Sequence, residues 1–128
     1  MNKCWVGAEY IISGDGHLVV LETLKHYMAK LESIQSPEYG ATNMFIGLVK
    51  QEAAKRMPQV EMTLDKVHRF LIGETTAQSL IDDIPIINSA IDSYRFDLVQ
   101  SQSKTDDAVV TATIARLDEA KQAINKFE

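Results

Sequence analysis

Apolar side chains recur at helical spacing in the first third of this chain. Within residues 17–35 successive apolar positions lie 4, 3, 4 and 3 residues apart, and charged residues fall between them. This spacing is typical of an amphipathic helix that buries one face. We therefore predict a helix over 17–35, with a buried seam of Val20, Leu24, Tyr27, Leu31 and Ile34.

A second helix is predicted over 37–57. Ser36 is a suitable N-cap, and Pro37 suits the first helical position because its fixed φ matches a helix. Pro58 disfavours helical conformation in the residue before it, so we expect the helix to end near Met57. Its apolar face is broad and comprises Phe45, Ile46, Leu48, Val49 and Ala53.

Two further long helices are predicted over 86–102 and 105–127. A polar turn separates them, and Thr105 is the expected cap of the second. The apolar seam of the first comprises Leu80, Ile84, Ile87, Ile91, Tyr94 and Leu98. The seam of the second comprises Val110, Ile114, Leu117, Ala120, Ile124 and Phe127.

The connection over 58–84 is expected to hold two short helices. Thr63 is a plausible cap for the first, and Gly73 is a good C-terminal stop for it. The sequence Thr75–Gln78 reads as a capping box that opens the second, which would run to about Ile84. Pro85 then either ends that helix or kinks it into the next.

These elements predict an all-α fold in one domain over residues 1–128. Short connections make the first two long helices antiparallel neighbours, and likewise the last two. The result is two antiparallel hairpins in a bundle-like arrangement. Residues 4–12 fit a strand or a short helix equally well, because the apolar run is too short to show a period. The glycine-rich turn after them, residues 13–16, breaks the chain.

The charge of the chain is unevenly distributed. The net charge is −5, and residues 74–128 carry five Lys/Arg and ten Asp/Glu, whereas residues 1–73 carry eight of each. A nucleic-acid partner is disfavoured, because phosphate neutralisation needs clustered cations. The nearest such cluster, Lys50, Lys55 and Arg56, falls at a predicted helix end, where cations complement the helix dipole.

A soluble protein of the reducing cytoplasm is expected. Cys4 is the single cysteine, so an intramolecular disulfide is impossible. No apolar run approaches the ~18 residues that a membrane span requires, and the N-terminus is a poor signal peptide.

The spacings of common helical metal sites are missing. No two acidic residues are three apart, and the only pair four apart is Glu61 and Asp65. No Glu is followed three residues later by His, as carboxylate-bridged di-iron bundles require. We therefore expect no metal and no cofactor, and the sequence leans away from an enzyme. His26 is expected to be exposed, and His68 to be half-buried within a short helix.

Nucleophile and phosphate-binding signatures are missing as well, which leaves surfaces and grooves. Met44, Met57 and Met62 cluster in the sequence. They could line an adaptable binding groove, although ordinary core filling is the simpler interpretation.

Two functions stay open at this stage. The first is a non-enzymatic helical protein that acts by association, as a homodimer or with another protein partner. It is favoured by the continuous apolar seams, the acidic C-terminal half and the missing catalytic spacings. The second is a small-molecule binder or enzyme with an apolar pocket between the hairpins. Its candidate ligand-binding residues are Tyr27, His68, Tyr94 and Arg95.

Overall fold

Two antiparallel helical hairpins form the body of the fold, as the sequence predicted. The structure is a computed structural model that describes residues 4–40, 42–102, 104 and 107–128. In the first hairpin α2 (Gly16–Ile34) pairs with α3 (Ile46–Leu71), and in the second α4 (Ile84–Gln102) pairs with α5 (Ala108–Ile124).

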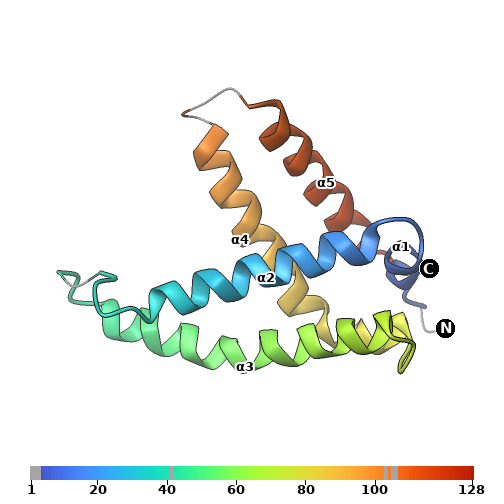
Figure 1. Cartoon of the computed structure of the whole chain (residues 1–128), viewed down its shortest axis with the longest axis horizontal. Coiled ribbons are helices and arrows are strands. Elements are labelled where there is room, and N and C mark those ends of the chain that lie inside the picture. The colour runs from blue at the N-terminus through green and yellow to red at the C-terminus, as the bar shows by residue number, and fades with distance from the viewer. Residues whose placement is uncertain (1–3, 41, 103, 105–106) are drawn as a thin grey trace.

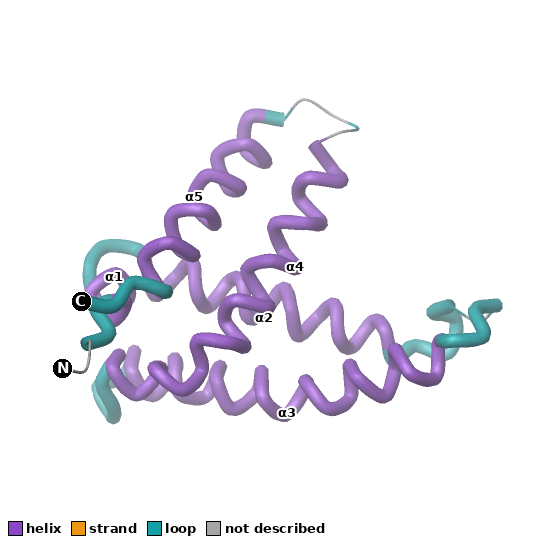
Figure 2. Tube along the Cα trace, turned by 180° about the vertical axis from the view of Figure 1, so that it is seen from behind, coloured by secondary structure: helices purple, strands orange, loops and turns teal. Residues whose placement is uncertain are grey.

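The second hairpin stands at a steep angle to the first (Figure 1). Helix α4 packs across α2, and the reverse view in Figure 2 shows α4 in front of it. Because α4 meets α2 near its middle, the loop end of the α2–α3 hairpin extends beyond this contact in both views. The α4–α5 hairpin therefore covers only part of the first one.

Of the two structures that the sequence allowed for residues 4–12, the short helix forms and the strand does not, apart from one isolated bridge. Trp5 forms an isolated antiparallel bridge with Phe127, and α1 (Gly7–Ile12) follows directly. The indole Nε1 of Trp5 donates a hydrogen bond to the carbonyl oxygen of Ile124 at 2.6 Å, within a buried environment. Residues 4–6 are thus joined to residues 126–128 beside α5.

The predicted helix over 37–57 is wrong at both ends. Helix α3 continues through Pro58 to Leu71. An interior proline costs about 3 kcal/mol because it removes one backbone hydrogen bond and crowds the preceding turn. Pro58 itself is exposed, whereas Val60 and Val67 beyond it are fully buried. Burial of the later turns therefore offsets the local cost of the proline.

The expected start at Ser36–Glu38 is not used. Turns occupy the described residues between α2 and α3, and Gly40 adopts a positive φ of 61° there. Most of these residues are exposed. A helix here would bury little apolar surface, so a good start signal alone does not form one.

The middle connection contains one short helix instead of the two that were predicted. The predicted helix between Thr63 and Gly73 is the last part of α3. Gly73 ends that helix as predicted, with a φ of 80°. The second is the 3-10 helix η1 (Ala77–Asp83), and the Thr76 side chain makes no capping bond to it. Helix α4 begins at Ile84, so Pro85 occupies its first turn, where a missing N–H costs little.

Helix α5 is shorter than the predicted 105–127. Asp107 is its N-cap, and a side-chain oxygen accepts a hydrogen bond from the backbone N–H of Val109 at 2.8 Å. Thr105, the cap that the sequence suggested, lies outside the described residues. Phe127 belongs to the terminal bridge and not to the helix.

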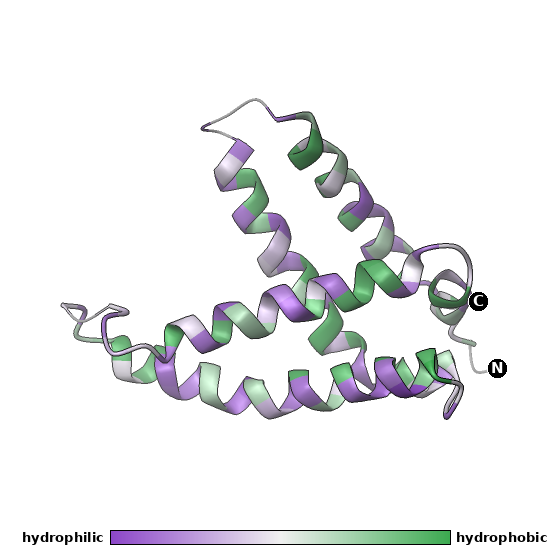
Figure 3. Cartoon of the chain, in the orientation of Figure 1, coloured by the Kyte–Doolittle hydropathy of each residue, from purple (hydrophilic) through white to green (hydrophobic). Residues whose placement is uncertain are grey.

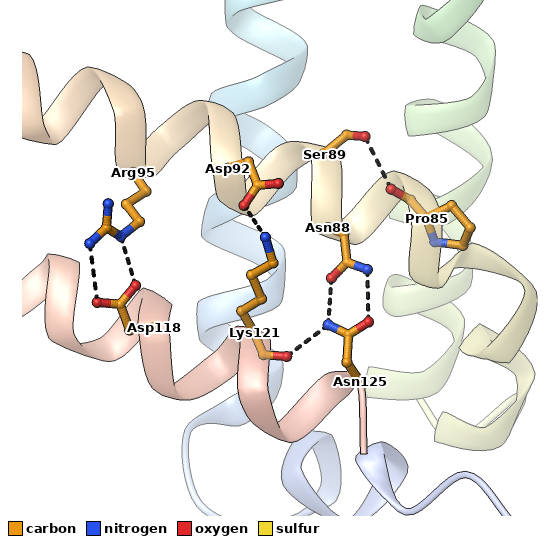
Figure 4. Close-up of polar contacts among 8 residues, drawn as sticks. All are labelled: Pro85, Asn88, Ser89, Asp92, Arg95, Asp118, Lys121 and Asn125. Atoms are coloured by element: carbon orange, nitrogen blue, oxygen red, sulfur yellow. Dashed lines mark hydrogen bonds and ion pairs between the residues drawn. The ribbon is translucent and has the colours of Figure 1, made fainter. Parts of the chain in front are cut away.

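A ladder of polar pairs fixes the register of α4 against α5 (Figure 4). Along α4 the paired positions rise by 4 and then 3 residues, and along α5 they fall by the same steps. Each exposed pair contributes little energy, but together they specify one antiparallel register. The pairs are Asn88 with Asn125, Asp92 with Lys121, and Arg95 with Asp118.

The short helix η1 is held to α3 by a buried carboxylate. The two oxygens of Asp83 accept hydrogen bonds from Thr63 Oγ1 and from Lys66 Nζ, both at 2.7 Å. The Asp83 side chain is only 13% exposed, and Thr63 is fully buried. Removing the carboxylate would leave a part-buried ammonium without its partner.

We expect the substitution Asp83→Ala to lower the free energy of unfolding by about 2–3 kcal/mol, because charge-assisted, part-buried bonds are lost. Urea denaturation measures this change. The matched control is Asp65→Ala, which removes an exposed pair with Arg69 on the same helix and should cost less than about 1 kcal/mol. Equal losses in the two variants would contradict the structural role of Asp83.

Candidate functional site

An apolar groove lies between α2 and α3 toward the loop end of their hairpin. Its volume is about 410 Å³. The lining from α2 comes from Tyr27, Lys30, Leu31 and Ile34, and the lining from α3 from Leu48, Val49, Glu52, Ala53 and Arg56. Six of these nine residues are apolar or aromatic, so we call this feature the apolar groove.

The charged groups of the groove are paired within the chain. The Arg56 guanidinium donates a hydrogen bond to the hydroxyl oxygen of Tyr27 at 2.9 Å and lies 3.6 Å from Glu52. The bond to Tyr27 is the main cause that raises the pKa of Arg56, and Glu52 adds to it. Lys30 on the opposite rim binds Asp97 of α4 at 3.0 Å. The groove therefore presents apolar surface together with cations that are already neutralised.

Exposed apolar side chains lie in the first turn of α3, which lines the groove, and in the turns just before it. Leu48 is 67% exposed, and just before α3 Met44 and Phe45 are 87% and 62% exposed. Val49 and Tyr39 are also exposed. Figure 3 shows hydrophobic segments in green at the start of α3, on the end of the hairpin that α4 and α5 do not reach. We call these five residues together with the groove the hairpin-end surface.

A polar cluster joins the rim of the groove to α4. The His26 ring stacks on the Tyr94 ring with their centroids 4.2 Å apart, and the Tyr94 hydroxyl donates to Glu22 at 3.0 Å. His26 Nε2 lies 3.6 Å from Asp97, the same carboxylate that binds Lys30. His26 Nδ1 is buried and has no hydrogen-bond partner. This cluster fixes α4 against α2 beside the groove.

Burial lowers the pKa of His26 below its usual value of 6.5, because desolvation disfavours the imidazolium. Asp97 and Glu22 oppose this effect, and Lys30 adds to it. Burial also raises the pKa of Tyr94, and its bond to Glu22 acts in the same direction. The expectation that His26 is exposed is therefore wrong, since its stripe of α2 faces α4.

The structure does not bring the four predicted ligand-binding residues together. Tyr27 lines the apolar groove, and Tyr94 lies in the cluster between α2 and α4. Arg95 pairs with Asp118 on the outside of the second hairpin (Figure 4). His68 is exposed near the end of α3, so the expected half-burial is wrong. The role of these residues in ligand binding stays a prediction.

Sequence reasoning missed Arg56 as a groove residue. The incorrect helix end at Met57 placed Arg56 in a terminal basic cluster, whereas it lies in the middle of α3. Of the three clustered methionines, only Met57 packs against the core, and Met44 and Met62 are exposed. The sequence signal that could have revealed the groove is the apolar run of residues 44–49. Its side chains point in too many directions around a helix to be buried on one face.

A larger depression of about 520 Å³ lies beside α1 and is polar. Its charged lining combines Arg116 with Asp15 and Glu119, and Tyr10 stands beside them. Burial raises the pKa of Tyr10, and Glu119 contributes to this. Charges of both signs spread over such an open surface do not define one ligand, so the apolar groove is the better candidate.

Neither metal ligands nor membrane spans stand out in the described part of the chain. No three His, Cys, Asp or Glu side chains among these residues gather into a possible metal site. None of the helices described is both long and apolar enough to cross a membrane. Comparisons with protein-family models, with curated proteins and with solved structures give no match to this chain. Its function therefore has to be inferred from the surface itself.

We expect the free energy of unfolding to fall as the pH drops below 6.5. In that range unfolded His26 takes up a proton that the folded form resists, so protonation favours the unfolded state. The substitution His26→Phe keeps a ring against Tyr94 and should flatten this part of the stability curve, measured by urea denaturation. His68→Phe is the control, because His68 is exposed in the last turn of α3, on a different helix from His26. An unchanged slope for His26→Phe would contradict this assignment.

Proposed function

We propose that this chain is a non-enzymatic helical protein that acts by association with a second copy of itself, through the hairpin-end surface. The observation that carries the proposal is the apolar groove beside Met44, Phe45 and Leu48, three large apolar residues that are more than half exposed. Isolated exposed apolar residues are ordinary, whereas a contiguous group around a groove marks an interaction site.

The area of this surface fits a dimer interface. From their exposed fractions, the five residues Tyr39, Met44, Phe45, Leu48 and Val49 present roughly 600 Å² to solvent. That is at the upper end of the largest patches on monomers, about 300–600 Å². Each partner in a standard-size interface buries about 800 Å², which this patch and the groove together approach.

The distribution of charge favours a second copy as the occupant. Residues 1–73, which include the whole hairpin-end surface, carry eight cations and eight anions, and the excess of −5 comes from residues 74–128. Two acidic chains therefore repel each other least when they approach through the α2–α3 hairpin. The rim cations Lys30 and Arg56 are neutralised within the chain, so they do not select an acidic partner.

Association accounts for the groove better than catalysis does. The charged side chains that line it are already paired, and none of them stands free as an acid, a base or a nucleophile. A reducing compartment such as the cytoplasm suits the exposed, free thiol of Cys4. The cytoplasmic location and the homodimeric state are both parts of what we propose.

A small apolar ligand is the second candidate, because the groove volume of about 410 Å³ lies within the range of ligand sites. In that case indole, used as an apolar probe, should shift the backbone amide resonances of Leu31 and Ala53 in a saturable manner. The shifts should diminish in Leu48→Glu, which places a carboxylate in the apolar lining of the groove. Weak shifts spread over all exposed apolar residues would exclude this candidate.

We expect the wild-type chain to dimerise and the substitution Leu48→Glu to weaken dimerisation by at least about tenfold. A buried, unpaired carboxylate in an interface costs more than the ~1.4 kcal/mol that this factor represents. Sedimentation equilibrium over a range of protein concentrations measures the change.

The matched control is Val109→Glu. Val109 is 72% exposed and, like Leu48, lies in the first turn of a long helix, but it is on α5. This variant should dimerise as the wild type does. A wild-type chain that stays monomeric at hundreds of micromolar, or equal effects of the two substitutions, would overturn the proposal.

A further inference from the structure

We infer that the corner formed by Met44 and Phe45 of each copy fills the apolar groove of the other copy. This inference rests on the proposed self-association and names the side chains that make the contact. The two interacting features are Met44 and Phe45, adjacent apolar residues that are both more than half exposed, and the groove beside them. Each copy would donate one corner and accept one.

Hydrogen bonds to Asn43 fix the backbone of the corner in the turn before α3. The Asn43 side chain accepts a hydrogen bond from the backbone N–H of Phe45 at 2.8 Å. The carbonyl oxygen of Asn43 also accepts from the N–H of Ile46, the first residue of α3. These bonds hold Met44 and Phe45 at the helix start, where both side chains project into solvent. Little backbone conformational entropy would be lost when a corner held in this way binds.

The groove has the chemistry and size to accept this corner. Its apolar walls are Leu31, Ile34, Leu48, Val49 and Ala53. A volume of about 410 Å³ corresponds to on the order of ten water molecules at ~30 Å³ each. An aromatic ring and a flexible thioether would displace that water and replace it with apolar contacts. The polar pair Arg56–Tyr27 needs no partner from the incoming corner.

The placement of the two features suits a twofold axis. Phe45 precedes Leu48 of the groove by less than one helical turn, so donor and acceptor lie at the same end of one hairpin. In a twofold interface the same patch of both copies meets, and two equivalent contacts form at once. The interface would then consist of the ends of two α2–α3 hairpins.

A complementation experiment tests this exchange. The Phe45→Ala chain keeps its groove but lacks the ring, whereas the Leu48→Glu chain keeps the ring but has a damaged groove. Each variant alone should dimerise at least about tenfold more weakly than wild type. Mixed in equal amounts they should form a heterodimer about tenfold tighter than either homodimer, because one intact contact of the original two is restored.

Sedimentation velocity with one chain fluorescently labelled measures the mixed species. Circular dichroism verifies that the variants fold. If Phe45→Ala does not fold, Met44→Ala is the second variant that removes a side chain of the corner. Ile12→Ala, which removes an exposed side chain of α1, is the control and should leave wild-type dimerisation unchanged.

The outcomes separate this inference from the proposed function. Weakening by Leu48→Glu without weakening by Phe45→Ala would overturn the inference and keep the dimer at this surface. A mixture no tighter than its components would do the same. Open-ended assemblies larger than a dimer would overturn the twofold exchange in favour of a head-to-tail contact. A monomeric wild type would overturn both proposals.

Discussion

Helix α2 is the element against which every other α-helix packs. Where the other helices cover α2 determines which part of its surface stays exposed. Helices α1, α3, α4 and α5 all contact it. Val20 and Leu24 in its first half are fully buried, because α4 and α5 cover the side that α3 leaves open. Toward Ile34 the second hairpin has diverged, and only α3 remains beside α2 (Figure 1). The apolar groove lies between α2 and α3 in this part of the molecule.

Local pattern was sufficient to predict α2, α4 and α5. In each of these helices one apolar stripe faces a neighbour, so the period in the sequence and the burial in the structure agree. The seam residues Leu24, Ile87 and Leu117 are all fully buried, as predicted. Antiparallel pairing also followed, because the connections between the helices of each hairpin are short.

Local pattern failed for α3, where tertiary burial opposes the local signals. The Ser36–Glu38 start and the Pro58 stop are both strong by propensity. A capping residue stabilises a helix by only about 1 kcal/mol. A helix over the exposed turn before α3 would gain little further stability, because it would bury little apolar surface. Val60 and Val67 become fully buried only if the helix passes through the proline. Such a balance depends on neighbours distant in sequence, so spacing alone cannot reveal it.

Of the four predicted ligand-binding residues only Tyr27 lies at the groove, and the position of the groove could not be predicted. Tyr27 was expected at a pocket and does line the groove, whereas His68, Tyr94 and Arg95 are placed elsewhere by the register of α3 and α4. The broad apolar face over 45–53 was visible in the sequence. Which side of it stays exposed depends on where α4 crosses α2, and that crossing is a tertiary property.

The cations around the groove already have hydrogen-bond partners within the chain, and this determines which kind of partner the groove can bind. Arg56 is held by Tyr27, Lys30 by Asp97, and the Lys50 ammonium by the carbonyl oxygen of Ser36 at 2.8 Å. A partner that covers the groove therefore leaves few of these donors unpaired, and the desolvation cost of binding is small. The same pairing removes the charge pattern by which a surface discriminates between partners. Specificity must then arise from shape, and in the exchange that we infer this shape is supplied by Met44 and Phe45 beside the groove.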